Sequence, residues 1–132
     1  VCSSDLILQD VLDTPVSPEL LPQEDDKIVQ KTEDIVGPYE LHDFFIYHMV
    51  RFGDEPRKLY KKTKLAFKDK YDKDTIKKWL RLFYWRFFSQ QFKRSCIPDG
   101  PKVGSVALSP RGDWRMPSDA NVQIWLDEVE RI

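Results

Sequence analysis

The apolar positions of this chain follow the spacing of helices rather than that of strands. Between Pro38 and Gly53 they recur every three or four residues, at Leu41, Phe44, Phe45, His48, Met49 and Phe52. This period predicts a helix with one inward face. Proline favours the first turn of a helix and glycine its end, so we expect the helix to begin near Pro38 and to end at Gly53.

Two further helices are predicted between residues 56 and 92. Pro56 favours a helix that runs to about Phe67, with Leu59, Tyr60, Thr63 and Phe67 facing inward. Asp72 or Asp74 is suited to cap the next helix, whose main apolar stripe is Ile76, Trp79, Leu80, Phe83 and Phe87. Leu82, Trp85 and Phe88 occupy other faces of it. We therefore expect this helix to be buried on more than one side.

A further helix is predicted near each end of the chain. Ser4 or Asp5 is suited to cap a helix that reaches about Leu12, and Ser118 is suited to cap a last helix with Val122, Trp125, Leu126 and Val129 inward. Segments 13–37 and 92–117 are long predicted loops, of the kind that bind something or stay disordered. No alternating strand pattern exceeds about five residues. The sequence therefore predicts a mainly helical fold.

Charge is distributed unevenly along the chain. The net charge of the 132 residues is −1, but residues 1–43 hold 2 basic and 11 acidic side chains, net −9, while residues 55–94 hold 14 basic and 4 acidic, net +10. The aromatic residues of the basic stretch fall mostly at core spacing, which favours a solvated helix face and no nucleic-acid partner. The alternative is a free-standing small helical module that binds RNA or an acidic protein through residues 55–94.

Several kinds of chemistry are not supported by the residues present. No apolar run approaches the roughly 20 residues that span a bilayer, so we expect no membrane partner and a cytoplasmic location. Cys2 and Cys96 are expected to be free thiols. His42 and His48 are about 240° apart around a helix and cannot hold one metal ion together. We expect no catalytic residue and no metal ligand in this chain.

Residues 91–102 combine cationic side chains with turn residues after the long buried helix. Lys93, Arg94 and Lys102 flank a segment rich in proline and glycine. Cations and free backbone amides together can cradle a phosphate group. The segment therefore predicts a site for a phosphate-bearing ligand, with an ordinary basic turn as the alternative.

Four segments of unusual composition carry a family resemblance. They are residues 31–45 (KTEDIVGPYELHDFF), 87–95 (FFSQQFKRS), 100–103 (GPKV) and 108–119 (LSPRGDWRMPSD). In this order they resemble the C-terminal part of bacterial glutamine-dependent NAD synthetases. The resemblance runs from about Ile7 to Ile132. We therefore expect residues 7–132 to be a fragment of an NAD synthetase domain, and residues 1–6 to be a non-native scar, with the parent reading frame starting upstream of Val1.

The resemblance implies an ATP-dependent ligase that amidates deamido-NAD to NAD through an adenylated intermediate, with ammonia taken from glutamine. It implies the helical C-terminal portion of an α/β Rossmann-like synthetase domain of the ATP-pyrophosphatase (adenine nucleotide alpha hydrolase-like) type. The sheet and the phosphate loop of that domain are absent from these residues, as is the N-terminal glutaminase domain. We therefore expect the isolated fragment to be inactive.

The resemblance also implies site residues and partners. Lys93, with its neighbours Phe92 and Arg94, is expected to contact deamido-NAD, and Ser17 is expected to lie near ATP. Residues 31–43 are similar to the mobile loop and helix that border the active site in this family. ATP and magnesium are implied for the full enzyme but not for this fragment alone, and a homo-oligomer is implied for the full-length protein.

Overall fold

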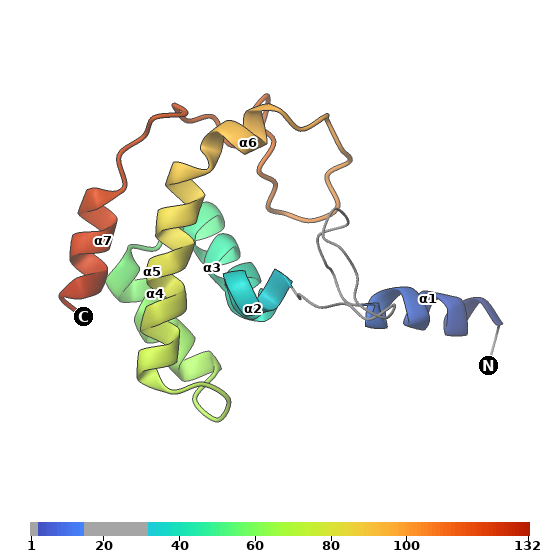
Figure 1. Ribbon diagram of the computed structural model, residues 1–132, viewed down its shortest axis with the longest axis horizontal. Helices are drawn as coiled ribbons and strands as arrows, with labels where there is room; N and C mark the ends of the chain where they lie inside the picture. The colour runs from blue at the N-terminus through green and yellow to red at the C-terminus, as the bar shows by residue number, and fades with distance from the viewer. Residues whose placement is uncertain (1–2, 15–31) are drawn as a thin grey trace, which may run out of the picture. The chain divides into compact units, whose positions relative to one another are not determined.

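The computed structural model describes residues 3–14 and 32–132, which form two compact units, 1–38 and 39–132. The first unit contains helices α1 (Ser3–Asp13) and α2 (Thr32–Val36). The second contains α3 (Tyr39–Phe52), α4 (Pro56–Ala66), α5 (Lys73–Ser89), α6 (Gln91–Ser95) and α7 (Gln123–Glu130) (Figure 1). No strand occurs among the described residues. The predicted mainly helical character is therefore confirmed.

The first unit confirms one prediction and corrects another. The predicted opening helix is present as α1, whose apolar residues from Leu6 to Leu12 are exposed. The expected loop over 13–37 is wrong at its end, because α2 lies there and ends at Val36, just before Gly37, which has a φ of 97°. α2 has no buried residue, so its sequence carries no apolar period that could have revealed it. Residues 15–31 of this loop lie outside the described residues.

The second unit is built around α5. Helices α3, α4 and α7 contact α5, and α7 also contacts α4 (Figure 1). The buried apolar core comprises Leu41, Phe45, Met49, Leu59, Tyr60, Ile76, Leu80, Phe83, Tyr84, Phe87, Phe88, Leu126 and Val129. These residues belong to four helices, so the core is shared among them. Burial of their apolar surface is the main stabilising contribution to the unit.

Helix α3 follows its predicted stripe except at its last residue. Leu41, Phe45 and Met49 are buried, and Gly53 ends the helix with a φ of 64°. Phe52 was expected inside but is exposed. It lies at the end of the last turn, where its ring packs on Tyr47 with 5.5 Å between centroids instead of entering the core.

Helix α5 is capped as predicted, although it is shorter than expected. Asp72 is the N-cap residue, and its Oδ1 accepts a hydrogen bond of 2.7 Å from the backbone N–H of Thr75. Of the residues expected on its other faces, Phe88 is buried, Leu82 is half-buried and Trp85 is 43% exposed, so burial on more than one side is confirmed only in part. The helix ends at Ser89, and a separate short helix, α6, follows.

The last helix starts later than predicted. Ser118 was expected to be its cap, but α7 begins at Gln123 with Val122 in the cap position and no side-chain cap. Asn121 takes part of that role, because its Oδ1 accepts a 2.7 Å hydrogen bond from Gln123 N. The inward positions Leu126 and Val129 are confirmed.

None of the helices in the described part of the chain is long and apolar enough to cross a membrane.

We predict that Leu80→Ala lowers the free energy of unfolding by about 2–5 kcal/mol, because truncating a buried leucine removes its apolar contacts and leaves a cavity. Leu80 lies on α5 and its side chain is fully buried in the core. Urea unfolding followed by circular dichroism measures the change. Leu65→Ala is the matched control, since Leu65 is 77% exposed and its truncation should change stability by no more than about 0.5 kcal/mol. Equal losses in the two variants would contradict the assigned core.

Candidate functional site

The predicted ligand-contacting residues lie on α6, the short helix after α5. Phe92 is 52% exposed, and Lys93 is exposed beside it, with its Nζ 6.0 Å from the centroid of the Phe92 ring. No carboxylate of the described residues forms an ion pair with Lys93. The pair therefore presents a positive charge and an aromatic ring to the surroundings.

Arg94 occupies a different place from its two neighbours. Its Nε donates a hydrogen bond of 2.7 Å to Gln91 Oε1, and its Nη2 donates one of 2.6 Å to the carbonyl oxygen of Phe87. The guanidinium carbon also lies 4.1 Å from the centroid of the Phe87 ring. Burial lowers the pKa of Arg94 from its ordinary value. The guanidinium group thus holds α6 against the end of α5.

The geometry of a helix explains this division. Gln91 and Arg94 are three positions apart and lie on one face of α6, and Gln91 is buried. Phe92 and Lys93 fall between them and face away. The contact of Arg94 with a ligand, which the resemblance implies, stays a prediction.

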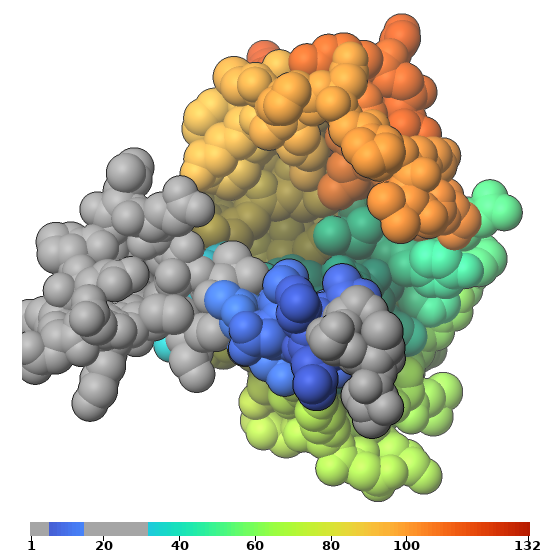
Figure 2. All heavy atoms as spheres, turned by 90° about the vertical axis from the view of Figure 1, so that its right-hand side faces the viewer, coloured from blue at the N-terminus to red at the C-terminus, as the bar shows by residue number. Residues whose placement is uncertain are grey.

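The segment after α6 forms an open loop with a hollow of about 400 Å³, lined by residues between Ile97 and Asp113. Figure 2 shows this segment, in orange, standing out from the helices of its unit. Lys102, expected to add a cation to the phosphate cradle, is paired with Asp113 at 2.9 Å. Arg111 pairs with Asp99 at 3.2 Å. Most of the loop's cations are therefore engaged within the loop, in contrast to Lys93.

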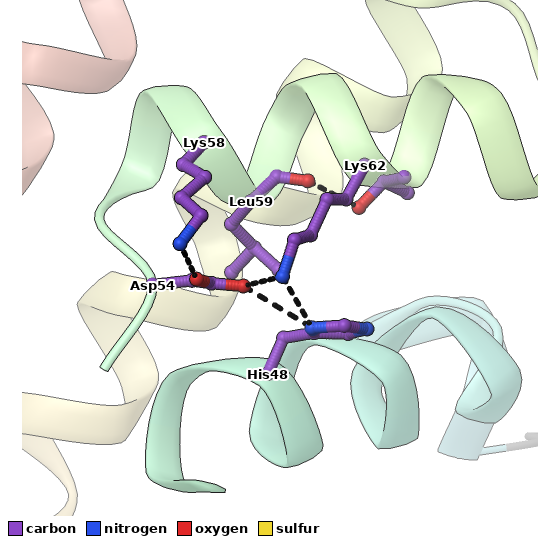
Figure 3. Close-up of polar contacts among 6 residues, drawn as sticks. His48, Asp54, Lys58, Leu59 and Lys62 are labelled. Atoms are coloured by element: carbon purple, nitrogen blue, oxygen red, sulfur yellow. Dashed lines mark hydrogen bonds and ion pairs between the residues drawn. The ribbon is translucent and has the colours of Figure 1, made fainter. Parts of the chain in front are cut away.

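A second polar cluster, which the sequence did not reveal, lies at the corner between α3 and α4 (Figure 3). The side chain of Asp54 is completely buried there. Its Oδ1 is 2.7 Å from Lys58 Nζ, its Oδ2 is 3.1 Å from His48 Nδ1, and Lys62 also bonds to Oδ2. Lys62 Nζ lies 3.2 Å from His48 Nδ1. His48, expected to be a packed histidine, is thus a partner in a polar network as well.

The charges of this cluster act on Asp54 in opposite directions. Burial by itself raises the pKa of Asp54, but the hydrogen bonds and positive charges of Lys58 and Lys62 outweigh it and lower the pKa to about 2. An ionised, buried carboxylate that bonds to side chains of two helices has a structural role, because it fixes the position of one helix relative to the other. Because a ligand cannot reach a fully buried carboxylate, the exposed residues of α6 are the better candidate for a binding site than this corner.

Comparison with known proteins shows what the chain as a whole is similar to. No family model matches the chain. Over 96% of its length, however, it is 44% identical to the glutamine-dependent NAD(+) synthetase of Mycobacterium leprae, and over 95% it is 41% identical to those of Mycobacterium bovis and Mycobacterium tuberculosis. The chain resembles a C-terminal part of the glutamine-dependent NAD(+) synthetases. It spans about a fifth of the length of these relatives, 21% in each case.

Three further predictions concern the ATP contact, metal ligands and the cysteines. Ser17, expected near ATP, lies outside the described residues. Among the residues that are described, no group of three or more His, Cys, Asp or Glu side chains could hold a metal ion. Cys96 is an exposed free thiol, as expected.

We predict that Asp54→Asn lowers the free energy of unfolding by about 1–2 kcal/mol at pH 7, because it removes charge-assisted hydrogen bonds while Lys58 stays partly in water. The stabilisation by an aspartate with a lowered pKa is complete above its ordinary value of about 3.9 and is lost as the pH falls through the folded-state value. The difference between parent and variant should therefore shrink between about pH 4 and pH 2. Urea unfolding at a series of pH values measures it.

Asp69→Asn is the control for this titration, since Asp69 is exposed and has no ion-pair partner among the described residues. It should leave stability nearly unchanged at every pH. A difference between parent and Asp54→Asn that stays constant down to pH 2 would contradict an ionised Asp54.

Proposed function

We propose that this chain is part of an ATP-dependent ligase that amidates deamido-NAD to NAD, with an adenylated intermediate and with ammonia taken from glutamine. The similarity of nearly the whole chain to proteins named glutamine-dependent NAD(+) synthetase supports this proposal. The helices would form the C-terminal portion of an α/β Rossmann-like synthetase domain. Its sheet and phosphate loop, and a glutaminase domain, would be supplied by other parts of the enzyme, which would act as a cytoplasmic homo-oligomer.

The observation that carries the proposal is the exposed Lys93 beside the exposed ring of Phe92, with no ion-pair partner for Lys93 among the residues that the structure describes. Deamido-NAD contains a pyrophosphate and two planar ring systems. An ammonium group pairs with phosphate oxygens, and an aromatic ring stacks on a planar base. Lys93 would thus bind the pyrophosphate and Phe92 would pack on a ring of the same ligand.

Arg94, itself expected to contact deamido-NAD, also supports the contacts of Lys93 and Phe92. Its hydrogen bonds to Gln91 and to the carbonyl of Phe87 fix α6 relative to the buried core. A cation held on a fixed element loses less freedom on binding than one on a mobile loop. The role of this chain would be to bind and orient deamido-NAD while ATP, with its magnesium, is bound elsewhere in the enzyme, with Ser17 near the ATP.

A chimera tests the proposal in a complete enzyme. The matching part of the Mycobacterium leprae relative is replaced by this chain, and NAD formation is followed with glutamine, ATP, magnesium and deamido-NAD. We predict an active enzyme in which Lys93→Ala raises the KM for deamido-NAD by about 10–100-fold, because a charge-assisted contact to phosphate is worth about 1.5–3 kcal/mol. The KM for glutamine should stay unchanged.

Lys78→Ala is the matched control, because Lys78 is an exposed lysine on α5 that packs over Trp79 and not at α6. It should change neither KM. Equal rises for deamido-NAD and glutamine in Lys93→Ala would contradict the assignment of Lys93 to deamido-NAD.

We predict that the 132-residue chain by itself makes no NAD from deamido-NAD, ATP and ammonia, because it lacks a phosphate loop. An enzymatic cycling assay for NAD is sensitive enough to decide this. NAD formation above the rate without protein would refute the expected inactivity of the isolated chain.

A further inference from the structure

One face of α4 carries lysines that form no ion pair with any carboxylate in residues 3–14 and 32–132. Lys61, Lys64, Leu65 and Lys68 are spaced at i, i+3, i+4 and i+7, so they line one side of α4 and of the turn that follows it; we call them the α4 basic face. Leu65, within this face, is 77% exposed. Figure 2 shows the turn after α4, in yellow-green, standing out at the bottom of the view.

The other lysines of α4 are used differently. Lys58 and Lys62 both bond to Asp54 and brace the corner with α3. In contrast, none of the lysines of the α4 basic face forms an ion pair with a described carboxylate. Lys64 lies 5.2 Å from the ring centroid of Tyr60, a contact that leaves its charge uncompensated. The face therefore combines unneutralised positive charge with one exposed leucine.

A hollow of about 560 Å³ borders this face. It is lined by Lys64, Lys68, Tyr71, Asp72, Lys73 and Asp74. The carboxylate of Asp72 is occupied, because it caps α5 through Thr75 and accepts hydrogen bonds from both its N–H and its hydroxyl. The three lysines thus outnumber the one carboxylate, Asp74, that is not used in the cap.

We infer that the α4 basic face is a docking surface for an acidic polypeptide segment that carries an apolar side chain among its carboxylates. Carboxylates of such a segment would pair with the lysines, and one of them would enter the hollow. The apolar side chain would cover Leu65, in the pattern of an apolar centre within a charged rim. This surface is separate from α6 and does not depend on the proposed function.

The chemistry of the face favours a polypeptide over a nucleic acid. Proteins that bind single strands place exposed aromatic rings among their cations, on which bases stack. Here Tyr60 is buried in the core, and the hydroxyl of Tyr71 is bonded to Glu40. The exposed side chain at the centre of the face is aliphatic, and the cations are lysines, which lack the planar fork of arginine.

Binding of defined probes to the 132-residue chain tests this inference. The main probe is a fluorescent helical peptide with glutamates around a stripe of leucines, and poly-L-glutamate and poly-uridylate are competitors. We expect salt-sensitive binding, measured by fluorescence anisotropy. The triple variant Lys61→Gln, Lys64→Gln and Lys68→Gln should weaken it about tenfold or more, since each surface charge contributes a few tenths of a kcal/mol up to about 1.

Two further variants make the test specific. Leu65→Ser should weaken binding of the leucine-bearing peptide several-fold without changing that of poly-L-glutamate. The matched triple Arg51→Gln, Lys78→Gln and Arg131→Gln removes the same charge from exposed positions on other elements and should have little effect. Circular dichroism confirms that each variant stays folded.

The contrary results are equally defined. If the two triple variants weakened peptide binding equally, the peptide would be attracted by the net charge of the protein alone. Stronger competition by poly-uridylate than by poly-L-glutamate would identify a nucleic-acid surface instead. Absence of peptide binding at low salt would show that the α4 basic face is simply solvated. Each of these outcomes would overturn the inference.

Discussion

The broad buried face of α5 is the constraint on which the rest of the unit depends. Its buried residues are Ile76, Leu80, Phe83, Tyr84, Phe87 and Phe88. A helix that is apolar over so much of its circumference must be covered by other elements, and the amphipathic helices α3, α4 and α7 supply that cover. The end of α5 also fixes α6, because Arg94 bonds to the carbonyl of Phe87 and lies over its ring. The packed core thus determines where Lys93 is exposed.

The basic stretch that dominates the charge pattern serves several purposes. Some of its cations are structural, as at the enclosed carboxylate of Asp54. Others tie the long helix to the last one, since Arg81 pairs with Glu130 at 2.6 Å and Lys77 bonds to the carbonyl oxygen of Glu130. Lys93 at α6 and the lysines of the α4 basic face, in contrast, form no ion pair with a carboxylate in the described part of the chain. The net charge of a segment therefore does not by itself indicate a function. It is also necessary to know which of its cations form ion pairs within the protein.

Much of the fold could be predicted from the sequence, because its core helices carry strong periodic patterns with Asp72 and Gly53 at their ends. The errors arise where that signal is weak. Phe52 continues the period but lies at the end of its helix, and α2 is too short and polar to show a period. The spacing of residues in the sequence likewise does not predict the burial of Asp54, because that burial depends on how α3 and α4 pack against each other. At α6, neighbouring cations are alike in sequence, yet the helix turns Arg94 inward and leaves Lys93 outside.

In the proposed enzyme, the buried core would hold α6 so that its outward residues meet deamido-NAD. Hydrogen exchange in a NAD synthetase that carries this chain as its C-terminal part tests it most directly, with and without deamido-NAD. Amide exchange slows where a ligand covers or orders the backbone. The account predicts slower exchange within Gln91–Ser95 and no change within Pro56–Ala66. Slower exchange confined to Pro56–Ala66, with none in Gln91–Ser95, would contradict it.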